Sequence, residues 1–408
     1  MSEQKILKFP KNFLWGASTS AYQIEGGNTN DWSEWEKSEV RSKQLEKEEK
    51  NLDDYICGQA CNSYKLFTED IKCLKELNCS AYRLGLEWAR IEPAEGKFNR
   101  QAIEHYGLIL KTLKENKIKV VLTLWHWTMP VWLSHLGGWN NKKTAAYFAR
   151  YSELVVKELG DYVDYWVTIN EPMLHVANGY LTGKWPPNRR NLAAAWQTYY
   201  NLIKAHQAAY DIIHKKFPRA EVGLTMLTNF FEPAHKWNLG EIILAKLANH
   251  CWNDRFVKKL KNKFDFLGLD YYFHDRLVWY PPFKKNLNKK ISDLGWEIYP
   301  QGLEQVLKNY QKFKKPLFIM ENGLADADDK LRPDFIKKHL AYIYQAIREG
   351  IDVRGYFYWS LLDNFEWDKG YWPKFGLYAV NRKTFKRTAR PSAKIYAEIC
   401  QNNQVEVD

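Results

Sequence analysis

Short apolar segments alternate along this chain with longer amphipathic stretches, and this alternation limits the possible folds more than any other feature. Strands that are buried on both faces are continuous apolar runs rich in Val, Ile, Leu and aromatic residues. Eight such strands are predicted, at Phe13–Thr19, Ala81–Trp88, Lys119–Trp127, Tyr165–Pro172, Glu221–Thr228, Phe264–Tyr272, Pro316–Gly323 and Val353–Asp363. Between them the pattern predicts helices such as Gln101–Asn116, Thr144–Leu159, Leu192–Lys216 and Arg332–Gly350.

Strands that alternate with helices form parallel sheets, and eight of them can close into a (β/α)8 barrel. The alternative is an open, doubly wound sheet. That fold carries a Gly-rich phosphate loop at the first strand, and the segment Trp15–Ser18 lacks this loop. The 408 residues exceed the roughly 150 that one domain usually takes. Because no linker or repeat interrupts the alternation, we expect a single TIM barrel domain over residues 1–408.

Composition and charge exclude several classes of protein. Apolar residues make up 45% of the chain, but no apolar run approaches the ~20 residues of a membrane span. The first ten residues contain no hydrophobic segment, so we expect a cytoplasmic protein with no membrane partner. The net charge of +12 comes from scattered residues and accompanies no nucleic-acid-binding motif, so no nucleic-acid partner is expected.

The six cysteines are expected to be free thiols, because no secretory signal accompanies them. Cys57 and Cys61 are spaced as two metal ligands could be, but no histidine or second cysteine pair completes a set. We therefore expect no metal site.

Two glutamates follow apolar strands at the edge where a barrel enzyme does its chemistry. Glu171 ends the fourth strand within TINEP, residues 168–172, and Glu321 ends the seventh within MENG, residues 320–323. A carboxylate in such a place is costly to bury unless it is paired or functional. Two carboxylates that face one pocket suit the cleavage of glycosidic bonds. The 18 Trp and 25 Tyr residues offer rings for stacking on sugars, and no GxSxG motif or plausible Cys–His pair supports acyl transfer.

Six ordered motifs identify a family. They are FPKNFLWGASTSAYQIEGG (9–27), YRLGLEWARIEP (82–93), LWHWTMPVWL (124–133), TINEP, MENG and YWSLLDNFEW (358–367). With them the chain resembles the family 1 glycoside hydrolases, the β-glucosidase family, over nearly its whole length. The resemblance implies a (β/α)8 barrel and a retaining mechanism that uses no cofactor and no metal.

The resemblance also implies a role for individual residues. Glu171 matches the family's acid/base and Glu321 its nucleophile, with Arg83, Tyr272 and Asn170 in support. We expect repulsion from Glu321 to raise the pKa of Glu171, while Arg83 keeps Glu321 ionised. The substrate-binding residues that the resemblance implies are Gln23, His126, Asn170, Glu366, Trp367 and Trp359, with Trp127 and Phe375 in the pocket wall.

These features predict a β-glucosidase, with possible β-galactosidase or β-fucosidase activity, that acts on small β-glycosides or oligosaccharides. The alternatives are the same chemistry tuned to β-mannosides or to transglycosylation, and a non-catalytic sugar-binding protein on the same barrel. The phospho-glycosidase subgroup carries Ser, Lys and Tyr where this chain has Glu366, Pro373 and Phe375, so that subgroup is excluded. The natural substrate and the oligomeric state stay open.

Two features depart from the family pattern. Asp270 stands where the family usually has Asn, and an extra carboxylate there raises the pKa of Glu321 unless Arg83 or another cation pairs with it. We expect Asp270 to be charge-paired and to lift the acidic limb of the pH–rate profile. The segment Gly179–Pro187 and the stretch between the sixth and seventh strands look unusual and short. Those loops shape the side of the pocket that receives the leaving group, so an open pocket is expected there.

Overall fold

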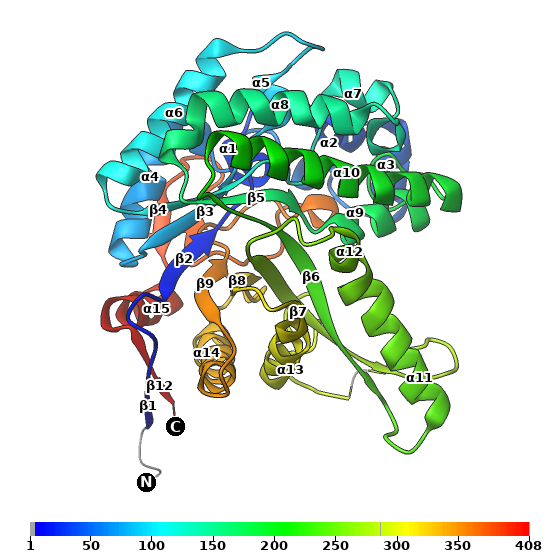
Figure 1. Cartoon of the computed structure of the whole chain (residues 1–408), viewed down its shortest axis with the longest axis vertical. Helices are drawn as coiled ribbons and strands as arrows, with labels where there is room; N and C mark the ends of the chain where they lie inside the picture. The colour runs from blue at the N-terminus through cyan, green and yellow to red at the C-terminus, as the bar shows by residue number, and fades with distance from the viewer. Residues whose placement is uncertain (1–4, 286, 408) are drawn as a thin grey trace.

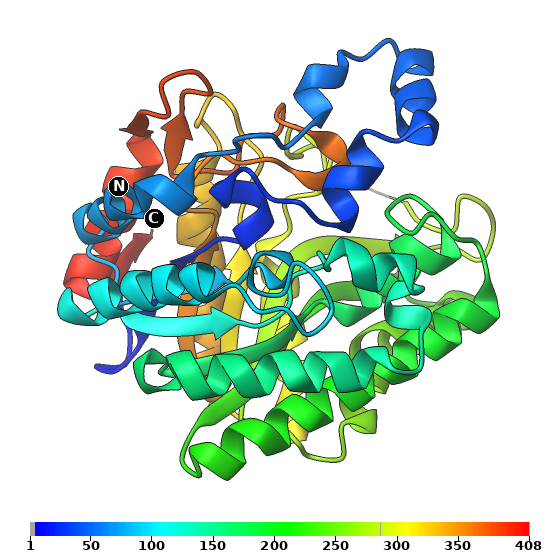
Figure 2. The same ribbon diagram turned by 90° about the horizontal axis from the view of Figure 1, so that it is seen from above.

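The eight predicted strands form a closed parallel barrel in the computed structural model, which describes residues 5–285 and 287–407. The predicted fold class is therefore confirmed. Each strand pairs with the next along the chain, and the last pairs with the first (Figures 1 and 2). The barrel strands are β2 (Leu14–Ser18), β3 (Ala81–Gly85), β4 (Lys119–Thr123), β5 (Tyr165–Asn170), β6 (Glu221–Pro233), β7 (Leu267–Leu277), β8 (Leu317–Asn322) and β9 (Val353–Trp359).

Helices surround the barrel (Figure 2). The longer ones are α3 (Glu39–Lys47), α4 (Ser63–Glu76), α6 (Arg100–Glu115), α8 (Thr144–Leu159), α10 (Leu192–Lys216), α11 (Leu239–Ala248), α13 (Pro300–Tyr310), α14 (Arg332–Arg348) and α15 (Pro391–Asn402). The short ones are α1 (Ala21–Glu25), α2 (Asp31–Glu36), α5 (Trp88–Ile91), α7 (Val131–His135), α9 (Pro172–Val176) and α12 (Arg255–Lys259). The predicted helices at 144–159 and 192–216 have the observed bounds.

Helix α6 illustrates why these segments are helical. Its buried residues include Ile103, Tyr106, Leu110 and Leu113, three or four positions apart, so they form one apolar stripe. The side chain of Asn99 accepts a hydrogen bond from the backbone N–H of Ala102 and caps the first turn. The helix thus begins at a capping residue and covers the barrel with a single face.

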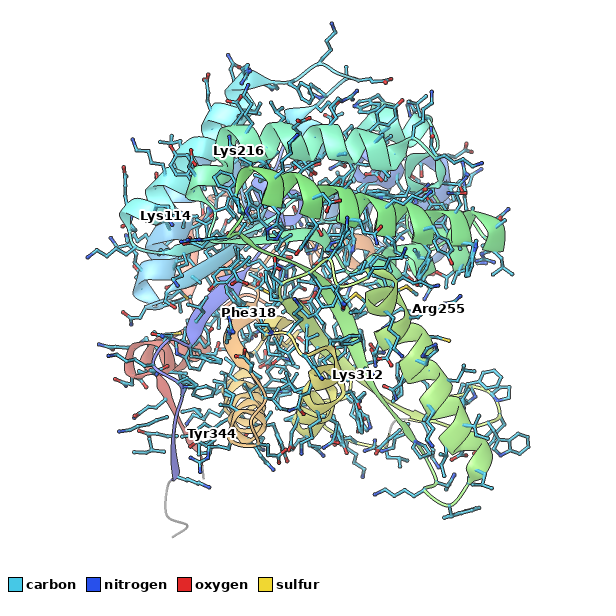
Figure 3. All side chains as sticks on the ribbon, in the orientation of Figure 1. Lys114, Lys216, Arg255, Lys312, Phe318 and Tyr344 are labelled. Atoms are coloured by element: carbon cyan, nitrogen blue, oxygen red, sulfur yellow. The ribbon has the colours of Figure 1, made fainter. Side chains whose placement is uncertain are left out.

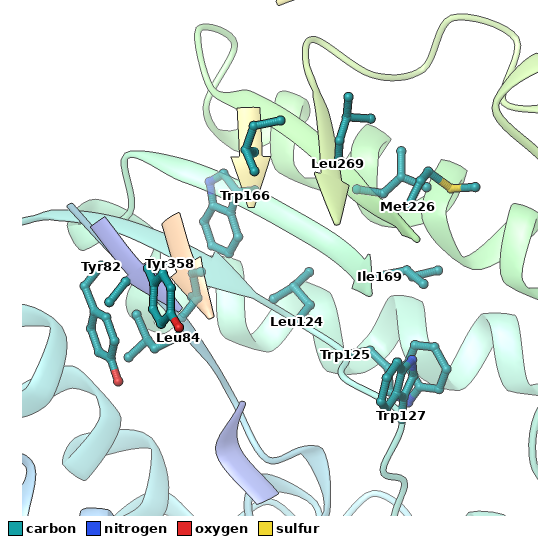
Figure 4. Packing of buried hydrophobic residues seen from close by; sticks show 14 of the residues in the cluster. Tyr82, Leu84, Leu124, Trp125, Trp127, Trp166, Ile169, Met226, Leu269 and Tyr358 are labelled. Carbon is teal, nitrogen blue, oxygen red and sulfur yellow. The ribbon is translucent and has the colours of Figure 1, made fainter. Parts of the chain in front are cut away.

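The barrel strands alternate between two apolar cores. Leu14, Val121, Val167 and Phe318 belong to a cluster inside the barrel, which also contains Ala81, Phe266, Met320 and Phe357. Their neighbours along the strands point outward and pack with the helices, as Tyr82, Leu124, Trp166 and Ile169 do in Figure 4. Side chains fill the space between the ribbons (Figure 3). This period of two explains why the strands are mostly apolar on both faces.

Two small antiparallel sheets were not predicted. Strand β1 (Lys5–Lys8) pairs with β12 (Gln404–Val407) and brings the two ends of the described chain together, as Figure 1 shows. Strand β10 (Tyr378–Val380) pairs with β11 (Arg387–Ala389). The predicted domain of residues 1–408 includes positions 1–4, 286 and 408, which lie outside the described residues.

Strands β6 and β7 are longer than predicted. The predicted strands end at Thr228 and Tyr272, whereas the backbone pairing continues to Pro233 and Leu277. The prediction was wrong because the partner strand, which is not visible in local periodicity, supplies the hydrogen bonds. The paired ends carry α11 away from the barrel at the lower right of Figure 1.

The register of pairing shifts in several barrel strands, β5, β7 and β8 among them. The shifts lie between Val167 and Asn170 in β5, between Leu269 and Asp270 in β7, and between Ile319 and Asn322 in β8. Such irregularities re-aim side chains and occur often beside active sites. They place polar residues of neighbouring strands at one end of the barrel interior.

Within the described residues, no helix is long and apolar enough to cross a membrane. All six cysteines are free thiols, as predicted.

Candidate active site

Three carboxyl groups meet at one end of the barrel interior, just after β5, near the start of β7 and near the end of β8. One oxygen each from Glu171, Asp270 and Glu321 lies within 4.8 Å of the others, and all three side chains are buried. Retaining glycosidases hold two carboxyl groups about 5–5.5 Å apart, close enough for one to attack the substrate directly. The pair Glu171 and Glu321 has the spacing that this chemistry requires.

Arg83 links the three groups to the barrel interior. Its Nη1 donates to Glu321 Oε1 at 2.5 Å and lies 4.0 Å from Asp270 Oδ1. Its Nη2 donates to Asn170 Oδ1, which also accepts from the hydroxyl of Thr225 at 2.5 Å. Glu321 Oε2 accepts from the Tyr272 hydroxyl at 3.1 Å. Both oxygens of Glu321 are therefore held by donors.

The surroundings separate the acidities of Glu171 and Glu321. The pKa of Glu321 is raised by burial, and Arg83 and Tyr272 limit this shift because both stabilise the ionised form. The pKa of Glu171 lies well above its usual value because of burial first, then the charge of Asp270, then that of Glu321. The predicted repulsion from Glu321 does raise this pKa, and burial raises it more because the side chain is buried. Glu171 is thus the group that holds a proton and Glu321 the one that stays ionised.

Asp270 is poorly paired. Its contact with Arg83 is at the limit of an ion pair, and neither carboxyl oxygen has a geometrically sound hydrogen bond within the described chain. The pKa of Asp270 is raised well above its usual value, by burial first and then by the charge of Glu321, while Arg83 opposes the shift. The expected neutralising ion pair is therefore only marginal. The guanidinium already supplies the positive charge among these three carboxyls, so we assign them no metal.

A cleft of about 320 Å³ opens over these groups, a size typical of small-ligand sites. Nine predicted site residues line it: His126, Trp127, Glu171, Tyr272, Glu321, Trp359, Glu366, Trp367 and Phe375. Three other predicted residues, Gln23, Arg83 and Asn170, are fully buried and hydrogen-bond to lining residues. The structure thus brings the predicted residues together in two layers.

His126 is oriented by the second layer. Asn170 Nδ2 donates to His126 Nε2 at 3.1 Å. Burial and the charge of Arg83 hold the pKa of His126 well below its usual value, so the ring is neutral. Since Nε2 accepts, Nδ1 carries the proton, and within the described chain Nδ1 has no hydrogen-bond partner. The ring itself is part of the cleft wall.

Three bulky cleft residues have backbone angles that only glycine adopts easily. The φ angles are +72° at Trp127, +40° at Glu171 and +50° at Trp367. Strained residues of this kind persist only where the surroundings enforce them, and they cluster at functional sites. This signal, which the sequence could not show, marks the same cleft.

A family model described as glycosyl hydrolase family 1 matches residues 5–259 and 251–405. The chain belongs to glycosyl hydrolase family 1. The predicted family is confirmed, and the protein is an O-glycosyl hydrolase, a retaining β-glycosidase.

Curated and solved relatives agree with this assignment. The chain is 32% identical to a 1,4-beta-D-glucan glucohydrolase of Thermotoga neapolitana over 97% of this chain and 99% of that protein. It is 36% identical to the structure of a beta-glycosidase from Pyrococcus horikoshii, with a TM-score of 0.89 over 98% of this chain and 96% of that one. A family 1 b-glucosidase from Thermotoga maritima in complex with isofagomine lactam is 30% identical, with a TM-score of 0.90 over 98% and 100% of the two chains.

Gln23 of this family 1 enzyme supports Glu366 from beneath. The Gln23 amide nitrogen donates to the carbonyl of Phe365 at 2.8 Å, to Asn364 Oδ1 at 3.0 Å and to Glu366 Oε2 at 3.3 Å. Burial, with the charges of Asp368 and Glu321, raises the pKa of Glu366 to about 8. The structure places Gln23 as a residue that orients Glu366, and Glu366 itself faces the cleft.

Sequence reasoning missed several residues of the cleft. Trp185 packs on Trp127 with ring centroids 4.6 Å apart, and Trp296 packs on Phe273 at 4.6 Å. Trp185 comes from the segment 179–187 that departs from the family pattern, and Trp296 from the short stretch between β7 and β8. The sequence offered one signal for Trp185 and Trp296, since each is a lone tryptophan in a polar loop. Other lining residues not predicted are Leu174, Asn178, Lys184, Leu227, Asp368 and Lys369.

Proposed function

We propose that the enzyme hydrolyses terminal β-D-glucosyl residues, with Glu321 as nucleophile and Glu171 as acid/base. The observation that carries this assignment is the asymmetry of the two groups. Arg83 and Tyr272 hold both oxygens of Glu321, whereas burial keeps Glu171 protonated. A nucleophile must be ionised and an acid must carry a proton, so only one assignment of roles fits.

In the first step, Glu321 attacks the anomeric carbon while Glu171 protonates the departing oxygen. The C–O bond to the leaving group breaks and a glycosyl ester of Glu321 forms. Neutralising Glu321 removes one of the charges that raise the pKa of Glu171. Glu171 can then accept a proton from water, which attacks the ester and restores both carboxyls. Two inversions give net retention.

The glycone side has polar groups suited to sugar hydroxyls. His126 and Glu366 line the cleft, and the ring of Trp359 supplies a flat apolar surface for stacking. Asn170 lies beside His126 and is proposed to contact the 2-hydroxyl. Trp127, Trp367 and Phe375 are proposed as the remaining wall.

Small β-glycosides or oligosaccharides are the proposed substrates, with β-galactosides and β-fucosides as further candidates. A cytoplasmic location stays a prediction, which fractionation of the native cells would test.

The test uses nitrophenyl β-glucoside, β-galactoside, β-fucoside and β-mannoside with the wild type and Glu321→Ala. We expect turnover of the β-glucoside with a β-configured first product by NMR, and its loss in the variant. Azide added to Glu321→Ala should fill the space of the lost carboxylate and give an α-glycosyl azide by one inversion. In Glu171→Ala, azide attacks the intermediate from the opposite face and should give the β-azide. If the two variants gave azides of the opposite configurations, Glu171 would be the nucleophile and Glu321 the acid/base. Preferred turnover of the β-mannoside would overturn the glucosidase assignment.

A further inference from the structure

The far end of the β6–β7 extension exposes an unusual number of large apolar side chains. Helix α11 and the turn before it expose Trp237 (80%), Leu239 (74%), Ile243 (65%) and Leu247 (55%). The loop after β7 exposes Trp279, Tyr280, Phe283, Leu287 and Ile291. We call these nine residues the extension surface. Single exposed apolar residues are ordinary on proteins, but contiguous groups of them mark interaction sites.

Backbone pairing holds the two parts of this surface together. Pro233 pairs with Leu277 at the ends of the two strands, and the N–H of Ala234 donates to the carbonyl of Leu277 at 2.9 Å. The turn that carries Trp237 and the loop that carries Trp279 therefore begin at the same point. Figure 1 shows α11 beside the ends of β6 and β7.

Helix α11 turns an apolar stripe outward. Leu239, Ile243 and Leu247 are four positions apart and exposed, while Glu241 and Ala245 are buried on the other side. The carboxylate of Glu241 is used internally, since it accepts from the backbone N–H of His235 at 2.7 Å and contacts the His235 ring. A surface helix normally buries its apolar stripe and exposes its polar face, and α11 does the opposite. We therefore expect another molecule to cover this stripe.

Positive charge accompanies the apolar residues. Residues 276–292 contain four lysines and one arginine but no aspartate or glutamate, and Lys284, Lys285, Lys289 and Lys290 are exposed. Lys236 and Lys246 are exposed around α11. Lys284 contacts Asp275 at 3.0 Å, on the strand behind it. Aliphatic and tryptophan side chains surrounded by lysines are typical of segments that lie in the headgroup region of a bilayer.

We propose that the extension surface docks this enzyme on an anionic lipid surface. A second copy of the chain fits less well, because a two-fold interface would place these lysines against their own counterparts. Nucleic acid fits less well because, although it could stack on the exposed rings, it would leave the aliphatic stripe of Leu239, Ile243 and Leu247 without an apolar partner. A bilayer with anionic headgroups satisfies both the apolar stripe and the charge.

Docking there would place the cleft close to the membrane. Phe273, which lines the cleft, lies on β7 four residues before the strand ends, and Trp296, also in the cleft wall, follows the exposed loop. The prediction of no membrane partner rests on the lack of a spanning apolar run in the sequence. An interfacial surface assembled from two separate segments leaves no such signal.

The experiment measures co-flotation of the purified full-length enzyme with phosphatidylcholine vesicles, with and without about one-third phosphatidylglycerol. We expect binding to the anionic vesicles alone, weakening as salt increases. The double variant Leu239→Gln, Ile243→Gln should lower the partition coefficient at least about tenfold. The triple variant Lys285→Gln, Lys289→Gln, Lys290→Gln should lower it roughly 100-fold. Hydrolysis of a soluble nitrophenyl glycoside should not change in either variant.

Matched controls change equal numbers of exposed residues elsewhere. Leu108→Gln with Leu192→Gln removes two exposed leucines, and Lys383→Gln, Lys386→Gln and Lys394→Gln remove the same charge. Both controls should bind as the wild type does. The proposal is overturned by absence of binding, by equal binding to neutral vesicles, or by an equal loss in the controls. A dimer in light scattering that the leucine and isoleucine substitutions dissociate would assign the surface to a second copy instead.

Discussion

The two ends of the barrel interior are built by the same strands and have opposite chemistry. At one end Ala81, Val121 and Phe318 pack in a closed apolar cluster. Two or three residues further along the strands, the interior holds Arg83, Thr123 and Glu321, linked by hydrogen bonds. The difference teaches that one structural element can serve stability at one end and catalysis at the other, since inward positions recur every second residue.

The two ends contribute differently to stability. Each fully buried apolar side chain contributes about 1.5–3 kcal/mol relative to an exposed one. A buried ion pair such as that of Arg83 and Glu321 contributes little net free energy, because removing both charges from water offsets their attraction. The polar end is therefore explained by catalysis, and substitutions at the two ends should separate activity from stability.

The largest effect is expected at Glu321. Glu321→Gln should lower kcat by more than about 10⁴-fold, because no carboxylate remains to attack the anomeric carbon. The amide keeps the shape and can still accept from Arg83, so thermal unfolding should change little. Steady-state kinetics with calorimetry check both. A large fall in Tm with most of the activity retained would mean that Glu321 serves stability rather than catalysis, which contradicts our assignment of the polar end.

Glu171→Gln should lower kcat/KM by about 10²–10⁴-fold for alkyl β-glucosides, whose leaving oxygen needs a proton. For a dinitrophenyl glucoside the loss in kcat/KM should be far smaller, because that group leaves unprotonated. In the wild type, kcat/KM should fall as pH rises through the raised pKa of Glu171, and this basic limb should vanish in the variant. Equal losses for both substrates would remove Glu171 from the role of acid.

At the apolar end, Phe318→Ala should lower the free energy of unfolding by about 3–5 kcal/mol. Phe318 is 1% exposed and packs against the rings of Phe266 and Tyr165. Kinetic constants of the folded enzyme should hardly change. Leu108→Ala, at a side chain 52% exposed on α6, is the control and should stay within about 0.5 kcal/mol. Denaturant unfolding measures both, and a cost for Phe318→Ala as small as the control's would contradict the packing argument.

The smallest effect is expected at Asp270. Asp270→Asn removes a carboxyl whose charge raises the pKa of Glu171, so the basic limb of kcat/KM should move to lower pH. The rate at the optimum should change less than about tenfold, since Asp270 holds neither reacting oxygen. The pH–rate profile is the measurement. An unmoved basic limb with a shifted acidic limb would mean that Asp270 acts on Glu321, as the sequence alone had suggested.

Much of the fold could be predicted because local patterns carry it. The apolar runs at Tyr165–Pro172 and Pro316–Gly323 predicted strands whose ends place Glu171 and Glu321 together, since parallel strands present their carboxyl ends at one edge. The paired ends of β6 and β7 were missed because each needs the other strand's hydrogen bonds. Strands β1 and β12 were missed for the same reason, at opposite ends of the chain.

The sequence by itself determined the barrel, the family and the two carboxyl groups, because periodicity and motif residues are local properties of the chain. Only the tertiary structure decided that Gln23 lies beneath Glu366, that burial dominates the pKa of Glu171, and that α11 turns apolar residues outward. Burial and electrostatic fields depend on every group packed around a residue. Those groups come from distant parts of the chain, so no local pattern records them.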